Sequence, residues 1–341
     1  MTTATIEMNM PRKGPASVLT PIQRQLNAPA AGEARVLIEA AGVAYADIVM
    51  RQGLYKGQPL PVTPGYDFVG RIEALGPGVA GLSIGQRVAA VTVAGSYATR
   101  RNVDVRWLVP APEDADPVAL AAAVLNGLTA WQMFHRIANP QAGESVLVHG
   151  AAGGVGSLLL DLARLARVQA IGTASSGKLA VVSSRGGVPL DHESRDVVSR
   201  VRDLSQGGVV AAFDHIGGKH FKKVSMPSLR AGGTGVLYGA YDATRDGKVN
   251  LLAMADILLN TRFSSFSLFG KGQGVVGYSS AVWRDARLAA YRADLTQVLQ
   301  LVGSGALSPL VGATFGLRDA AAAQKALESR SVTGKIVLLA Q

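Results

Sequence analysis

Residues 145–157 constrain the fold of this chain more than any other segment. They read Ser-Val-Leu-Val-His-Gly-Ala-Ala-Gly-Gly-Val-Gly-Ser, a short apolar run followed by closely spaced glycines. A side chain at Gly150, Gly153 or Gly156 would block a tight turn, the approach of a pyrophosphate to backbone N–H groups, or helix–strand packing. The expected helix 155–167 then directs its positive N-terminal end at that phosphate. The segment predicts a dinucleotide-binding turn, with an ordinary glycine-rich turn as the alternative.

The pattern around this turn predicts two kinds of structure along the chain. The first third alternates apolar and polar residues, and Gly and Pro separate its segments, which predicts a β-rich start. From Glu144 onward, strands alternate with helices, which predicts an α/β region with a doubly wound parallel sheet. In the helix 155–167 we expect Asp161, Arg164 and Arg167 to form one polar stripe, with four leucines including Leu165 facing inward. The expected strands are 34–40, 67–75, 87–93, 145–149, 168–173, 209–214, 235–238 and 334–339, and the other expected helices are 46–51, 116–137 and 320–327.

The residues after the second strand of the α/β region predict which dinucleotide is bound. A site that prefers NAD usually carries Asp or Glu there, to hold the ribose hydroxyls. The segment 171–178 has no carboxylate, but it offers Ser175, Ser176 and Lys178. Two hydroxyls and an ammonium suit a 2′-phosphate, which a carboxylate would repel. We therefore predict NADP(H) as the cofactor; a polar surface loop is the alternative.

Composition and charge exclude several other classes of protein. The chain of 341 residues has no cysteine, which removes disulfides and thiolate-ligated metals, and its start has no secretory signal. The long uncharged run 117–134 contains polar residues and is interpreted as a buried helix. The net charge of +10 is dispersed, without a long basic run. We therefore expect a cytoplasmic protein that binds neither a membrane nor nucleic acid.

Several motifs together resemble the medium-chain dehydrogenase/reductase superfamily, in its zinc-free quinone oxidoreductase (zeta-crystallin-like) branch. The resemblance spans nearly the whole chain, and the order and spacing of the motifs make it specific. The matching segments are the glycine turn and residues 41–47, 51–55, 64–70, 75–79, 127–131 and 334–338.

The resemblance implies a GroES-like β-rich catalytic domain and a Rossmann domain for NADP. We expect the catalytic domain in residues 1–122, completed by residues 269–341, and the Rossmann domain in residues 123–268. It further implies that Thr129 lies near the nicotinamide and that Gly153, Gly154 and Val155 line the pyrophosphate path. Gly217, Tyr238 and Gly239 are expected at the sheet edge where the dinucleotide lies, and His192 stands where relatives often have Tyr.

The same resemblance argues against a metal. Zinc-dependent members carry cysteine where this chain has Ala44, and His-Glu where it has Tyr66-Asp67. Alanine and tyrosine do not supply the thiolate or imidazole ligands that zinc requires. His215 and His220 follow an expected strand, but two histidines without a third ligand do not define a site. We therefore expect no metal.

Without a strong Lewis acid, quinones and α,β-unsaturated carbonyls are the favoured hydride acceptors, because the negative charge that develops on hydride addition delocalises onto oxygen. The resemblance implies that Tyr45 and Tyr55 are substrate-pocket residues, since both lie in matched motifs that border the family's active-site cleft. A phenol there can bond a carbonyl or stack on a quinone; the alternative is that their rings only pack the core. The resemblance also implies a homodimer through a Rossmann edge strand near Arg262–Gly270, and Lys271–Gly274 is interpreted as a mobile loop. The alternative is that the Phe side chains of this segment are buried within one subunit.

These observations predict an NADPH-dependent, metal-free reductase of a quinone or an α,β-unsaturated carbonyl compound. Two other functions stay open at this point. One is an enoyl-thioester reductase on the same scaffold, and the other is a non-enzymatic binder of NADPH or RNA.

Overall fold

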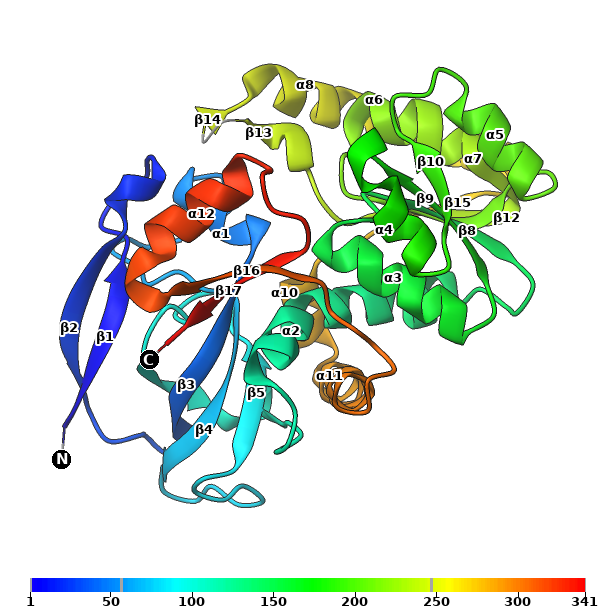
Figure 1. The fold of residues 1–341 in the computed structure, drawn as a ribbon. Coiled ribbons are helices and arrows are strands. Elements are labelled where there is room, and N and C mark those ends of the chain that lie inside the picture. Colours follow the sequence, from blue (N-terminus) through cyan, green and yellow to red (C-terminus); the bar gives the residue numbers. More distant parts are fainter. Residues whose placement is uncertain (1, 56–57, 246–247, 341) are drawn as a thin grey trace. The chain divides into compact units, whose positions relative to one another are not determined.

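The computed structural model describes residues 2–55, 58–245 and 248–340, which form two compact units (Figure 1). The first unit holds Met1–Leu128, Asp246–Lys248 and Ser280–Gln341; the second holds Thr129–Arg245 and Val249–Ser279. Both main boundaries between the units lie later in the chain than the boundaries expected from the sequence, which followed residues 122 and 268. One falls inside helix α2 (Pro117–Trp131), and the other follows strand β15 (Gly274–Gly277), which belongs to the sheet of the second unit.

The second unit is built on a parallel sheet of six strands in the order β10-β9-β8-β11-β12-β15. After β10 the chain returns to the other side of β8, so the carboxyl ends of β8 and β11 mark the switch point where doubly wound sheets bind ligands. The sequence prediction of a doubly wound parallel sheet is confirmed. The strands are β8 (Ser145–His149), β9 (Gln169–Ala174), β10 (Val188–Asp191), β11 (Val209–Asp214), β12 (Leu229–Leu237) and β15.

Helices cover both faces of this sheet. Leu147 of β8 and Ile171 of β9 are register partners, and they share a buried cluster with Val201 of α5 (Val197–Leu204) and Met226 of α7 (Met226–Ser228). The opposite face packs against α3 (Gly154–Leu165) and α4 (Leu179–Ser184), where a Cβ on Gly172 would meet Ala151 and Val182 within 2.7 Å. Packing on both faces therefore fixes the strand ends and the glycine turn relative to the helices. This unit also contains the helices η3 (Gln132–Ala138), η4 (Ser176–Lys178), α6 (Gly218–His220), η5 (Phe221–Ser225), η6 (Tyr241–Ala243), α8 (Leu251–Asn260) and α9 (Ser265–Lys271).

The polar stripe expected on the helix after the turn is wrong in two places. Asp161 is 4% exposed, because its carboxylate accepts a hydrogen bond from Arg185 Nη1 at 2.7 Å. Leu165, which was expected to face inward, is 44% exposed in the last turn of α3. A distant arginine thus compensates the buried charge, and periodicity alone does not identify such a partner.

The expected edge strand near Arg262–Gly270 is also wrong. Residues Ser265–Lys271 form α9, and β15 is the strand at the edge of the sheet. Phe263 and Leu268 pack against the core of the second unit, whereas Phe266 and Phe269 are each 81% exposed. The segment Lys271–Gly274 is the junction between these elements, since Gly272 ends α9 with a φ of 59° and Gly274 begins β15. Phe263, Phe266 and Phe269 recur every three residues, which is a helical spacing, whereas the expected strand rested on the family resemblance.

The first unit contains a sheet of seven strands, in the order β16-β17-β3-β4-β5-β7 with β6 also paired to β3. The C-terminal strand β17 pairs with β3, so the end of the chain completes the sheet begun by its first third. Its strands are β3 (Glu33–Val43), β4 (Asp67–Leu75), β5 (Arg87–Val91), β6 (Arg100–Asp104), β7 (Val109–Pro110), β16 (Val311–Gly316) and β17 (Lys335–Leu339), beside the hairpin β1 (Thr3–Asn9) and β2 (Thr20–Leu26). It also contains the helices α1 (Tyr45–Arg51), α10 (Ser280–Ala286), α11 (Leu288–Gly303) and α12 (Ala320–Glu328), the first part of α2, and the short 3-10 helices η1 (Ala16–Val18), η2 (Val105–Trp107) and η7 (Leu317–Asp319).

The long apolar helix is buried. Residues Pro117–Ala138 are long and apolar enough to cross a membrane, yet 72% of the apolar window lies inside the structure. Leu120, Val124 and Leu128 are fully buried. This burial is that of a core helix, as the sequence predicts.

Candidate functional site

The glycine turn joins β8 to the N-terminus of α3. Gly150 has a φ of 63°, a left-handed conformation that favours glycine, and its carbonyl accepts a hydrogen bond from Gly153 N at 2.8 Å. A Cβ on Gly156 would lie 2.3 Å from Gly150 O and 2.7 Å from Ala151 Cα, so α3 can start this close only with glycine there. Gly150 and Gly156 therefore shape the turn.

Gly153 has a different role from the other two glycines. It precedes the first residue of α3 with an extended backbone, and a Cβ on it would approach only Gly150 O, at 3.1 Å. Gly153, Gly154 and Val155 are partly exposed. The helix N-terminus thus has backbone N–H groups that a phosphate can reach, which is the arrangement that the pyrophosphate of a dinucleotide needs.

The predicted phosphate-recognition residues lie at the end of the neighbouring strand β9. Ser175 precedes the short 3-10 turn η4 (Ser176–Lys178), and Lys178 N donates to Ser175 O at 2.8 Å. Both serines are exposed and Lys178 is half-buried. No side-chain hydrogen bond or ion pair joins these three to any described residue. The loop therefore presents two hydroxyls and one ammonium group that are available to an anion.

The structure brings four further predicted residues to the same edge of the sheet. His192 follows β10, and its Nδ1 lies 3.1 Å from Ala174 O, the residue before Ser175. Gly217 follows β11 with a φ of 83°, and Tyr238 N donates to Asp214 O at 3.0 Å. A Cβ on Gly239 would lie 2.8 Å from His215 O, so the chain after β12 passes close to the chain after β11. Thr129 comes from another element, since it is buried in α2.

The first unit holds the two candidate tyrosines, and it adds a third that sequence reasoning treated only as a missing zinc ligand. The hydroxyl of Tyr55 lies 2.6 Å from the hydroxyl of Tyr66, and their rings meet edge to face at 6.4 Å. Tyr66 is 3% exposed, whereas Tyr55 is half-buried. Burial raises the pKa of both phenols, so both stay protonated near neutral pH. Tyr45 begins α1 and is not part of this pair.

A buried carboxylate fixes the segments that carry these tyrosines. Asp47 is fully buried in α1, and it accepts hydrogen bonds from Ala44 N, Gly65 N and Tyr97 Oη at 2.9, 3.1 and 2.9 Å. The bond to Gly65 fixes the residue before Tyr66 relative to α1. Burial is the main reason that the pKa of Asp47 is raised to about 6. Asp47 therefore positions the tyrosine pair.

A catalytic zinc does not fit the first unit. Ala44 has only a methyl group, and Tyr66 is a protonated phenol bonded to Tyr55. Among the described residues, the one group of three potential ligands is His149, Asp214 and His220, which lies in the second unit. The donor set that zinc requires is therefore missing where related enzymes would hold it.

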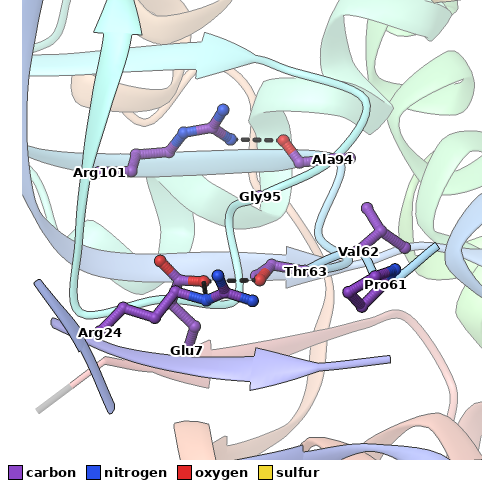
Figure 2. Close-up of a pocket in the computed structure, with 8 residues that line it drawn as sticks. All are labelled: Glu7, Arg24, Pro61, Val62, Thr63, Ala94, Gly95 and Arg101. Carbon is purple, nitrogen blue, oxygen red and sulfur yellow. Dashed lines mark hydrogen bonds and ion pairs between the residues drawn. The ribbon is translucent and has the colours of Figure 1, made fainter. Parts of the chain in front are cut away.

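A hollow of about 400 Å³ in the first unit is a different feature (Figure 2). Its lining includes Glu7, whose carboxylate accepts from Thr63 Oγ1 at 2.9 Å and pairs with Arg24 Nε at 3.3 Å. Arg101 donates to Ala94 O, and burial lowers its pKa to about 10. These contacts engage the charged side chains of the lining, and none of the predicted site residues contributes to it.

Comparisons with known proteins agree with this architecture. Residues 30–113 match the alcohol dehydrogenase GroES-like domain, and residues 187–338 match the zinc-binding dehydrogenase family. A probable quinone oxidoreductase of Schizosaccharomyces pombe is 33% identical over 336 residues, covering 96% of this chain and 95% of that protein. The synaptic vesicle membrane protein VAT-1 homolog of Mus musculus is 31% identical over 317 residues, covering 92% and 77%. The structure of mycobacterial Rv1454c complexed with NADPH matches with a TM-score of 0.84 and 29% identity, covering 98% and 99%.

The two units and the glycine turn define a medium-chain dehydrogenase/reductase, a superfamily of oxidoreductases. Within that superfamily, the chain belongs to the zeta-crystallin-like quinone oxidoreductase branch. The resemblance predicted from the sequence motifs is confirmed.

Proposed function

We propose that this protein is an NADPH-dependent reductase that transfers a hydride to a quinone or an α,β-unsaturated carbonyl compound without a catalytic metal. One observation carries the proposal. A glycine turn open to a phosphate and a carboxylate-free loop with Ser175, Ser176 and Lys178 lie at the ends of adjacent strands.

The residues of the second unit fit NADPH. Backbone N–H groups at Gly153, Gly154 and Val155 would hold the pyrophosphate, because this helix N-terminus is accessible. Ser175, Ser176 and Lys178 would hold the 2′-phosphate, because their polar groups have no partner among the described residues. When bound, the cofactor supplies the hydride from its nicotinamide ring. We propose that Thr129, His192, Gly217, Tyr238 and Gly239 line the rest of the dinucleotide.

The proposed acceptor class follows from the missing zinc ligands and from the hydroxyl of Tyr55. A simple aldehyde or ketone needs strong polarisation of its carbonyl, which zinc provides in related dehydrogenases. A conjugated acceptor spreads the developing charge onto oxygen, so it needs orientation and one good hydrogen-bond donor. Tyr55 is the proposed donor, because Tyr66 behind it is buried and fixes its hydroxyl at 2.6 Å.

This role predicts unequal effects for the two tyrosines. Tyr55→Phe should lower kcat for an enone by about 100-fold, within the range that proton donors contribute. Tyr66→Phe leaves the donor in place without its partner, so a smaller loss of about tenfold is expected, which is the effect of one hydrogen bond. The double variant should be no worse than Tyr55→Phe alone, since the two residues act as a unit.

Steady-state kinetics with the same enone measures these effects, with melting temperatures as the check on folding. Tyr45→Phe is the comparison, because Tyr45 is the other tyrosine that the sequence predicts for the substrate pocket. Equal losses for Tyr45→Phe and Tyr55→Phe would contradict the assignment of Tyr55.

The function itself is tested by screening acceptors. NADPH oxidation should be fast with quinones, enones and alkenals, slow with simple aldehydes, and unchanged by prior chelation of metals. Enoyl thioesters form a separate arm of the screen. A preference for them would place the enzyme among enoyl-thioester reductases, and no oxidation with any acceptor would contradict an enzymatic role.

We also propose a cellular location, a substrate type and an oligomeric state. We propose a cytoplasmic homodimer that takes small-molecule substrates and binds no nucleic acid. Among the described residues, β15 is the outer strand of the second unit's sheet beside β12, so the dimer contact is now assigned to β15 and the adjoining α9.

A further inference from the structure

Three side chains meet at the switch point of the parallel sheet. His149 is the last residue of β8, Asp214 is the last residue of β11, and His220 ends the short helix α6. One ring nitrogen of each histidine and one carboxylate oxygen all lie within 4.8 Å of one another. His220 Nδ1 lies 2.8 Å from Asp214 Oδ2, and the two imidazole rings are 4.4 Å apart between centroids.

His149 has a buried ring nitrogen that no described residue satisfies. The residue is 1% exposed, and its Nδ1 lies 3.0 Å from the hydroxyl of Thr173. Its Nε2 is buried and has no hydrogen-bond partner among the described residues. Leaving a buried polar atom unsatisfied destabilises the folded state. Such an atom in a native structure therefore calls for a bound water or ion.

The carboxylate in this cluster is held rigidly. Asp214 Oδ1 accepts hydrogen bonds from Ile216 N at 2.7 Å and Gly217 N at 2.9 Å. Asp214 Oδ2 accepts from Ser225 Oγ at 2.5 Å. Together with Thr173 on His149, these contacts orient the side chains as the outer partners of metal ligands do.

We infer that His149, Asp214 and His220 form a site for a divalent transition-metal ion such as Zn²⁺ or Co²⁺. The ligand atoms are His149 Nε2, Asp214 Oδ2 and His220 Nδ1, and water completes the coordination. The ion takes the place of the hydrogen between His220 and Asp214, and the His220 ring then carries its proton on Nε2. Two imidazoles with one carboxylate select this class of metal over Mg²⁺ and Ca²⁺, which prefer oxygen ligands.

The cluster also revises the argument that excluded a metal from the sequence. That argument paired His215 with His220 and lacked a third ligand, but the His215 ring lies against Tyr241, with centroids 5.1 Å apart. The true partners of His220 come from two strand ends that are 65 residues apart in sequence, at positions 149 and 214. The site lies in the second unit, whereas Ala44 and Tyr66 belong to the first, and its ion ties the ends of β8 and β11 together.

Metal binding to the full-length protein tests the inference. After chelation and removal of the chelator, the protein should bind one Zn²⁺ per chain in calorimetry, with a Kd below about 10 μM. Bound Co²⁺ should give the visible spectrum of a nitrogen- and oxygen-ligated site. Zn²⁺ should also raise the melting temperature, because it binds only the folded chain.

Two variants and one control make the test specific. His149→Gln and His220→Gln should each weaken Zn²⁺ binding by at least about 100-fold, since even an outer-shell change costs 10–100-fold. His135→Gln, which removes a histidine outside the cluster, should bind as the unmodified protein does. His220 lies at the rim with 27% of its side chain exposed, so its variant provides the test even where His149→Gln does not fold.

Two results would overturn the site. No saturable Zn²⁺ binding would mean that His149 Nε2 holds only a water molecule. Binding that both variants retain would mean an adventitious surface ion. Because the readout is binding and stability, failure here leaves the proposed reductase activity untouched, and a failed acceptor screen leaves the metal site untouched.

Discussion

The unmodified protein is expected to use NADPH at least about tenfold better than NADH in kcat/KM. A charge-assisted contact to the 2′-phosphate contributes roughly 1.5–3 kcal/mol, which corresponds to about 10- to 100-fold in affinity. Ser176 is exposed and Lys178 half-buried in the loop after β9, and neither side chain is engaged by a described residue. Replacing both, as Ser176→Ala with Lys178→Ala, should remove most of this preference. The loss should come from weaker use of NADPH, with NADH nearly unaffected.

Steady-state kinetics with both coenzymes at one fixed ionic strength measures this preference, because salt weakens contacts to phosphate. Lys222→Ala is the matched control, since it removes the same charge from an exposed lysine of the same unit. The control should leave the ratio of NADPH to NADH use unchanged. Equal use of the two coenzymes by the unmodified protein would show that this loop does not recognise the phosphate.

The second large effect is expected at Gly156. An alanine Cβ there would lie 2.3 Å from the carbonyl oxygen of Gly150 and 2.7 Å from Ala151 Cα, both backbone atoms that cannot rotate away. The N-terminus of α3 must then shift from the turn, at a cost of roughly 1–3 kcal/mol in stability. Gly156→Ala should therefore lower the melting temperature and weaken NADPH binding by about 100-fold, because the phosphate-binding N–H groups move with the helix.

Two other glycines separate the effect on the fold from the effect on the cofactor. Gly153→Ala meets only Gly150 O at 3.1 Å, so its melting temperature should change little while NADPH binding weakens. Gly270→Ala in α9 meets nothing within 4 Å and should change neither quantity. Thermal melts and fluorescence titration with NADPH distinguish the three variants. Unchanged NADPH affinity in both Gly153→Ala and Gly156→Ala would contradict the assignment of this turn to the pyrophosphate.

Features set by neighbours in sequence were predictable, and those set by distant partners were not. The strand Asp67–Leu75 lies between Pro64-Gly65 and Gly76-Pro77-Gly78, and Ser145–His149 runs into the glycine turn, so turn residues defined these ends. Asp161 was misplaced because Arg185, which compensates its burial, is 24 residues away. The run containing Phe266 and Phe269 was expected to be an edge strand from the family resemblance, but it forms α9, and the edge position belongs to β15.

The same distinction between local motifs and distant contacts applies to the residues of the candidate site. The glycine turn and the loop at Ser176 are local motifs, so sequence reasoning placed them at neighbouring strand ends, as the structure has them. The pairing of Tyr55 with Tyr66 depends on Asp47, which bonds Gly65 across 18 residues. The cluster of His149, Asp214 and His220 depends on parallel strands that pair only in the folded sheet. No spacing in the sequence signals either of these contacts.

Tracing the transferred hydride with deuterium tests the central claim, metal-free hydride transfer from NADPH to a conjugated acceptor, most directly. NADPH deuterated at the transferred position of its nicotinamide would be incubated with the chelator-treated protein and an enone. We expect the deuterium on the carbon β to the carbonyl, at the rate of the untreated protein. Loss of turnover on chelation that only added metal restores would contradict the account, and so would deuterium on the carbonyl carbon itself.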